Sequence, residues 1–117
     1  MNRQQIKELL DEWIDKGLLG SRMTFVEMEK REGEKTLKRK LKEKLLIPTS
    51  FSLNLYVAPE IAEELEKLID NKQILSVEKA MVLFKVYSSY KVNELCAQGG
   101  LLKYNRLGKN SLIYINE

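Results

Sequence analysis

Glycine and proline residues divide this chain into short segments. Gly17, Gly33, Pro48 and the pair Gly99 and Gly100 each end a stretch in which apolar residues recur at the spacing of an amphipathic helix. Glycine readily adopts the backbone conformations that end helices, and proline disfavours helical geometry in the residue before it. The spacing therefore predicts several short helices joined by small strands, a mainly α fold with a small β component (α+β).

The period of the apolar residues locates these elements. In residues 2–16, Ile6, Leu10 and Trp13 recur at intervals of three or four and share one face of a helix. The polar stretch 70–73 interrupts the pattern and predicts a boundary between a helical subdomain, residues 1–72, and a second subdomain, residues 73–117. No repeat of fixed period is visible. The predicted helices span 2–16, 25–31, 34–46, 59–70, 77–86 and 90–98, and the predicted strands span 51–57, 101–104 and 112–115.

The composition excludes several classes of chemistry. The chain of 117 residues contains no histidine and a single cysteine, Cys96, which falls on the apolar face of its predicted helix. A disulfide framework, a zinc finger, a haem site and any catalysis that needs an imidazole base are therefore excluded. The sequence also lacks a glycine-rich phosphate loop and a pair of carboxylates placed for acid–base chemistry. We expect a protein that is not an enzyme and needs no cofactor or metal.

The overall charge permits an anionic partner without requiring one. Lysine and arginine number 20 against 17 aspartates and glutamates, which gives a net charge of +3. The apolar runs are far shorter than the ~20 residues that a membrane-spanning helix needs, and the first residues contain no apolar signal region. We expect a cytoplasmic protein with no membrane partner.

The cations concentrate in the predicted helix 34–46. Residues 35–44 contain six cations and a single carboxylate, that of Glu43. Lys38, Arg39 and Lys42 could follow a phosphate backbone, where each neutralised phosphate releases counterions. Alternatively, this is an amphipathic helix with a solvated cationic face, whose charge the acidic helix 59–70 compensates.

Residues 74–116 combine two short helices, a polar turn between them and a basic two-stranded hairpin. The order and spacing rest on Leu75–Ala80, Leu83, Val86, Val92, Leu95, Cys96, Gly99, Gly100, Leu101, Arg106–Lys109, Ile113 and Ile115. This part of the chain resembles the small excisionase-type winged helix related to the MerR DNA-binding domain. It departs from that family at Lys85, where a glycine is usual, in a turn that is one residue longer, and in a second helix with few cations.

The resemblance implies a winged helix-turn-helix at the C-terminus and a mode of binding. In that mode the second helix enters the major groove and the hairpin, or wing, lies along the DNA backbone or the adjacent minor groove. Residues 5–57 have a comparable order of helices and a strand, so a second winged-helix-like unit could precede it. The residues implied to contact nucleic acid are Tyr90, Lys91, Asn93 and Gln98 on the second helix, and Lys103, Arg106 and Lys109 on the hairpin.

The sequence favours a small non-catalytic nucleic-acid-binding protein, an excisionase-like architectural or regulatory factor of mobile or phage-type DNA. Duplex DNA is the favoured partner, but a single strand stays open because Tyr87, Tyr90, Tyr104 and Tyr114 could stack on unpaired bases. The alternative is an accessory subunit that docks on a larger DNA-processing enzyme such as a polymerase, helicase or recombinase. Contact through the hairpin requires that its cations point outward, away from the chain's own carboxylates.

Overall fold

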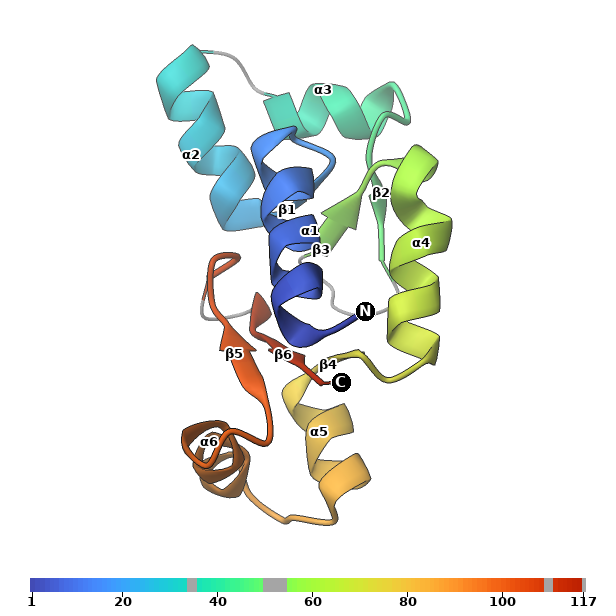
Figure 1. Cartoon of the computed structure of the whole chain (residues 1–117). Helices are drawn as coiled ribbons and strands as arrows, with labels where there is room; N and C mark the ends of the chain where they lie inside the picture. The colour runs from blue at the N-terminus through green and yellow to red at the C-terminus, as the bar shows by residue number, and fades with distance from the viewer. Residues whose placement is uncertain (34–35, 50–54, 109–110, 117) are drawn as a thin grey trace.

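The first half of the chain folds around a small antiparallel sheet. The computed structural model describes residues 1–33, 36–49, 55–108 and 111–116 (Figure 1). Strand β3 lies between β1 and β2 and pairs antiparallel with both. The elements are α1 (Arg3–Asp15), β1 (Leu19–Ser21), α2 (Arg22–Glu32), α3 (Thr36–Lys42), β2 (Ile47–Pro48) and β3 (Leu55–Val57).

The second half contains another antiparallel sheet with its own three helices. Strand β6 lies between β4 and β5. The elements are α4 (Pro59–Asp70), β4 (Ile74–Leu75), α5 (Val77–Phe84), α6 (Ser89–Ala97), β5 (Leu102–Tyr104) and β6 (Ile113–Ile115). Together the two halves confirm the predicted α+β class. No helix in the described part of the chain is long and apolar enough to cross a membrane.

The second half repeats the architecture of the first. Both halves run helix, strand, helix, helix, strand, strand, and in both sheets the third strand is central. The register repeats as well: the central strands pair at Val57 with Leu19 and Ile47, and at Ile115 with Ile74 and Leu102. An offset of 55 residues relates Leu19 to Ile74 and Ile47 to Leu102. We call residues 3–57 the first repeat and residues 59–115 the second repeat.

The same offset relates the local signals that begin and end the helices. After the first helix of each repeat the chain turns through a left-handed residue, Gly17 with φ of 71° and Lys72 with φ of 59°. Ser21 and Ser76 then cap the next helix, each accepting a hydrogen bond from the backbone N–H three residues further on. A serine in this position satisfies one of the free N–H groups at the start of a helix. Equivalent turns therefore lead into equivalent helix pairs.

The sequence shows no repeat of fixed period, but the architecture repeats. Some equivalent positions carry the same residue, as in Ile6 and Ile61 or Leu10 and Leu65, and all four are buried. Most others keep only their apolar or polar character, and the offset of 55 at Ile47 and Leu102 rises to 58 at Val57 and Ile115. The two repeats therefore share their strand pairing and their pattern of burial, whereas few of their equivalent positions carry the same residue.

The largest apolar cluster crosses both repeats. It joins buried residues of α1, such as Ile6 and Trp13, to α4 and to strand residues of both sheets, Ile113 included. Trp13, which shares a helix face with Ile6 and Leu10, is buried in this cluster. A smaller cluster lies between α5, α6 and the second sheet. The larger cluster contains residues on both sides of the predicted boundary at 72 and 73, and the division at that point stays a prediction.

Several element boundaries differ from those predicted. The predicted helix 25–31 begins earlier, at Arg22, because Ser21 caps it; the Thr24 side chain completes the capping box by accepting from the Ser21 N–H. Helix α3 ends at Lys42, well before Pro48, because Lys44 adopts a φ of 60° and breaks the helical geometry. Of the predicted strand 51–57, residues 51–54 lie outside the described residues. Strands β1, β2 and β4 are too short to show the alternation of apolar and polar residues that would predict a strand.

Candidate nucleic-acid interface

Helices α2 and α3 pack together at one end of the molecule, and α5 and α6 lie at the opposite end (Figure 1). The molecule is elongated, with extents of 42 × 25 × 22 Å. The sequence-predicted contact residues on the two helix pairs are therefore not brought together. Lys38, Arg39 and Lys42 lie at the α2–α3 end, and Tyr90, Lys91, Asn93 and Gln98 lie on or directly after α6 at the other end.

The α2–α3 end presents an excess of cations to solvent. Lys38, Arg39 and Lys42 on α3 are exposed, and none of them forms an ion pair within the part of the chain that the structure describes. The carboxylates that are exposed among the described side chains of residues 22–44 are those of Glu27 and Glu43. The exposed cations of this end are Arg22, Lys30, Arg31, Lys38, Arg39, Lys42 and Lys44.

Lys40 behaves differently from its neighbours on α3. It is half-buried, and its Nζ lies 5.8 Å from the centroid of the Phe25 ring on α2. A cation over an aromatic face is attracted by the ring quadrupole, so this contact helps to hold α3 against α2. Lys40 therefore contributes to packing, and the cations beside it remain available to a partner.

The repeat gives the cations of α3 an equivalent position on α6. The 55-residue offset matches Lys38 to Asn93 and Arg39 to Glu94, both on the second helix of the helix pair. Lys38 and Asn93 are thus candidates at equivalent positions, whereas Arg39 corresponds to the acidic Glu94 and Lys42 to Ala97. On α3 this face is cationic, whereas on α6 it is polar.

Helix α6 has little free positive charge. Tyr90 is 67% exposed, and Lys91, Asn93 and Gln98 are exposed. The Lys91 ammonium, however, lies 3.3 Å from a Glu94 carboxylate oxygen and is partly neutralised by it. Lys103 on β5 is exposed. The α6 face therefore offers hydrogen-bonding and aromatic groups more than charge.

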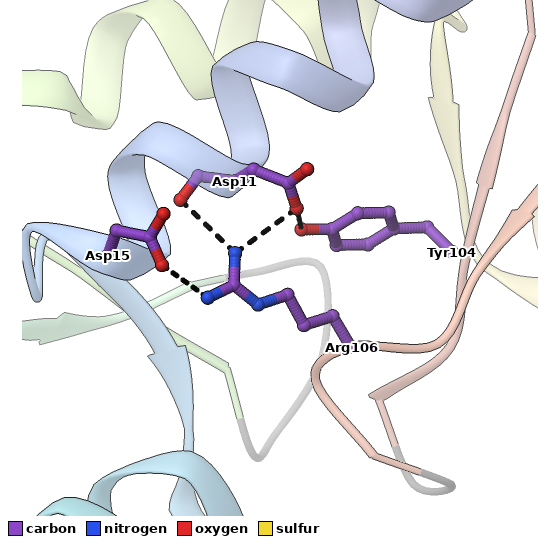
Figure 2. A network of polar contacts seen from close by, with 4 residues as sticks. All are labelled: Asp11, Asp15, Tyr104 and Arg106. Atoms are coloured by element: carbon purple, nitrogen blue, oxygen red, sulfur yellow. Dashed lines mark hydrogen bonds and ion pairs between the residues drawn. The ribbon is translucent and has the colours of Figure 1, made fainter.

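The hairpin after α6 does not present Arg106 to a partner. Figure 2 shows its guanidinium directed at α1, where Nη1 lies 3.2 Å from Asp11 Oδ1 and Nη2 donates to Asp15. The Tyr104 hydroxyl donates a hydrogen bond of 2.6 Å to the same Asp11 oxygen. Contact through the hairpin required outward cations; Arg106 does not meet that requirement, and Lys109 lies outside the described residues.

The network of Asp11, Asp15, Tyr104 and Arg106 ties the two repeats together. The Tyr104 hydrogen bond and the neighbouring Arg106 hold the pKa of Asp11 below its usual value, although burial opposes them. Burial and the bond to the Asp11 carboxylate raise the pKa of Tyr104. The hydrogen bond to Asp15 raises the pKa of Arg106. Asp11, Tyr104 and Arg106 therefore keep the charge states that bind one another near neutral pH, and the network has a structural role.

The tyrosines and the cysteine are only partly available for binding. Tyr104 and Tyr114 are buried, at 4% and 2% exposed, so neither can stack on a base. Tyr87 and Tyr90 are exposed. Cys96 is half-buried on α6, and burial raises the pKa of its thiol, which lowers its reactivity. Within the described residues no cluster of three or more potential ligand side chains is placed to hold a metal ion.

Comparison of the chain with models of known protein families, with curated proteins and with solved structures found no match. Sequence reasoning missed the part that α1 plays, because Asp11 and Asp15 look like solvated charges on the polar face of a helix. The repeated helix-strand-helix-helix order was the signal that could have revealed the symmetry.

Proposed function

We propose that the chain is a non-catalytic nucleic-acid-binding protein built from two winged-helix-like repeats, in which α3 makes the main contact with duplex DNA. In a winged helix-turn-helix, the second helix of the helix pair enters the major groove. The order of elements in each repeat, a helix, a strand, a helix pair and a hairpin, agrees with that architecture. The observation that carries the proposal is the uncompensated cationic face of α3 in the position of the second helix.

The dimensions and charge of α3 suit this role. An α-helix is about 10–12 Å in diameter with its side chains, which fits a major groove about 12 Å wide, and the seven residues of α3 span about 10 Å along the helix axis. Exposed lysine and arginine at its C-terminal end can contact phosphates on both sides of the groove. If Lys38, Arg39 and Lys42 each neutralise one phosphate, the logarithm of the affinity falls with the logarithm of the salt concentration with a slope of about −2.7 from these residues alone.

The second repeat supplies the likeness to excisionase-type domains. Lys85 stands where that family has a glycine, and its φ of 56° lies in the left-handed region that glycine favours. Tyr90, Asn93 and Gln98 would add hydrogen bonds to base edges when α6 reaches the same duplex. Arg106 has no part in this proposal because α1 already binds it. A role on mobile or phage-type DNA remains part of the proposal, supported by the likeness in residues 74–116.

The test is a fluorescence-anisotropy titration of the full chain with a labelled mixed-sequence duplex at two salt concentrations. The variant Arg39→Gln/Lys42→Gln removes two exposed cations from α3. The matched control, Lys16→Gln/Lys67→Gln, removes two cations that pair with glutamates on α1 and α4. Because each variant loses two positive charges, the two variants have the same net charge. We expect the α3 variant to weaken binding at least tenfold and to reduce the salt slope by about 2, with a much smaller effect in the control. Equal losses in both variants would refute α3 as the contact.

A second candidate function is favoured by one observation. The α5–α6 end exposes large apolar and aromatic side chains, with Val82 at 79% and Tyr87 at 95%. Exposed apolar groups of this kind are typical of protein interfaces. The chain would then be an accessory subunit of a DNA-processing enzyme. That function predicts weak binding of the isolated chain to DNA in the same titration and no difference between the two variants.

A further inference from the structure

An open hollow lies between α1 and the end of β5, beside the network shown in Figure 2. It has a volume of about 390 Å³, and we call it the α1–β5 hollow. Because Asp11 on one wall binds Tyr104 and Arg106 on the other, the two walls are held in place without a ligand. The lining residues are Lys7 and Asp11 on α1, and Lys103, Tyr104, Asn105 and Arg106 on β5 and the turn that follows it.

The α1–β5 hollow is lined by more cations than carboxylates. Lys7, Lys103 and Arg106 carry positive charges, whereas Asp11 has the only carboxylate among the described residues that line it. Arg106 compensates Asp11 and also Asp15, which does not line the hollow. Even with both carboxylates counted, the three cations leave an excess of positive charge, so the hollow attracts an anion.

The two lysines of the hollow are the cations that a ligand would meet. Within the part of the chain that the structure describes, neither Lys7 nor Lys103 forms an ion pair. Lys7 is half-buried on α1, and Lys103 is exposed on β5. The 55-residue offset matches Lys7 to Ala62 and Lys103 to Pro48, which carry no charge. The two ammonium groups therefore belong to this hollow and are not a general feature of the repeated architecture.

We propose that the α1–β5 hollow binds a dianionic phosphate group through the ammonium groups of Lys7 and Lys103. Each wall contributes one ammonium, and the side-chain amide of Asn105 can donate a hydrogen bond to a further oxygen. A phosphate dianion matches the two lysines in charge and offers at least three acceptor oxygens, whereas a carboxylate offers one charge and two oxygens. Arg106 stays bound to α1 and compensates Asp11, which would otherwise repel the ligand.

This inference does not rest on the binding of duplex DNA by α3, because none of the lining residues lies on α3. The variant Arg39→Gln/Lys42→Gln should therefore leave phosphate binding in the hollow unchanged, whatever its effect on the binding of duplex DNA. The two proposals can thus fail separately.

The probe for the hollow is inorganic phosphate. It is titrated into the ¹⁵N-labelled full chain at about pH 8, where phosphate is largely dianionic, with the ionic strength held constant by sodium chloride. We expect amide chemical-shift changes at Lys7, Lys103 and Asn105 with a Kd of about 1–10 mM, because ion pairs that are open to solvent each contribute little. Acetate at the same ionic strength should bind at least fivefold more weakly.

Protein variants locate the contact. Lys7→Gln/Lys103→Gln should weaken phosphate binding at least fivefold, and Lys7→Arg/Lys103→Arg, which keeps both charges, should retain it. The matched control is Lys16→Gln/Lys67→Gln, which removes two cations that do not line the hollow and should leave binding unchanged. No binding of phosphate, equal weakening in both glutamine variants, or equal binding of acetate and phosphate would each overturn the proposal.

Two further probes distinguish the sources of the phosphate. Adenosine monophosphate represents a small phosphorylated compound, and a duplex with 5′-terminal phosphates represents the end of a nucleic-acid strand. The probe that changes the amide shifts of Lys7 and Lys103 identifies the source, and either result supports a dianionic ligand. Equal changes with the duplex that lacks terminal phosphates would show that the hollow takes backbone phosphodiesters, and would overturn the proposal of a dianion.

Discussion

The carboxylate of Asp11 is the centre of the contact between the repeats, and its removal gives the most direct test of that contact. Asp11→Ala leaves the buried Tyr104 hydroxyl without its acceptor, which costs about 1–3 kcal/mol. Loss of the partly exposed ion pair with Arg106 adds about 0.5 kcal/mol. The better helix propensity of alanine returns about 0.5 kcal/mol. We therefore expect a loss of about 2 kcal/mol in the free energy of unfolding.

The assay is urea unfolding followed by circular dichroism and by tryptophan fluorescence, which must coincide if the transition is two-state. The melting temperature should fall by about 6–10 °C. Asp15→Ala removes only an ion pair from an exposed side chain and should cost less than about 1 kcal/mol. Glu66→Ala, at the equivalent position of the second repeat, has no partner to lose among the described residues and should change stability by less than about 0.5 kcal/mol.

Two outcomes would refute the reasoning. If Asp11→Ala and Glu66→Ala cost the same, the contact with the hairpin contributes nothing. If Asp11→Ala costs as much in a Tyr104→Phe background as in the original chain, the hydrogen bond between these two side chains is not the source of the loss. A double-mutant cycle should instead give a coupling of about 1 kcal/mol or more.

Two further predictions concern acid stability and packing. The pKa of Asp11 is lowered in the folded chain from its ordinary 3.8, so its stabilisation is complete above that pH and is lost as the pH falls through the folded value; the difference in urea stability between the original chain and Asp11→Ala should therefore shrink from pH 7 to pH 3, and a constant difference would contradict it. Gly20→Ala places a methyl group 2.6 Å from the Phe25 ring and should lower the free energy of unfolding, measured by thermal denaturation, by about 1–3 kcal/mol. Gly33→Ala meets open space and loses only the left-handed preference of glycine, about 1 kcal/mol. A larger loss for Gly33→Ala than for Gly20→Ala would show that the Phe25 ring moves aside freely.

The sequence predicted the elements that depend on local signals. Helix α4 was predicted at its observed bounds because a proline at its start, a four-residue apolar stripe and the polar stretch after it all lie within the helix or beside it. The cations of α3 were likewise visible as a run of charge. Strands β1, β2 and β4 were not predicted, since two or three residues cannot show an alternation and only pairing with a distant strand defines them.

Some properties of the candidate site residues could likewise be predicted from local sequence, and others could not. That Lys38, Arg39 and Lys42 are exposed follows from the amphipathic pattern, because charged side chains on a short helix stay in water unless paired. The contacts of the Arg106 guanidinium could not be predicted from the sequence, because its partners Asp11 and Asp15 lie 95 and 91 residues away in the chain. The hairpin that contains Arg106 was predicted correctly, but a guanidinium on a loop binds the carboxylates that tertiary packing brings close to it.

What the sequence determined by itself is the set of helices, the cationic face of α3 and the absence of imidazole chemistry, since each depends on residue type and on spacing within a few turns. Only the tertiary structure decided that the chain contains two equivalent repeats and that Arg106 of the second repeat binds Asp11 and Asp15 on α1 of the first. These features depend on how strands pair and helices dock across the whole chain, and such contacts tolerate many residue identities as long as size, polarity and register are kept.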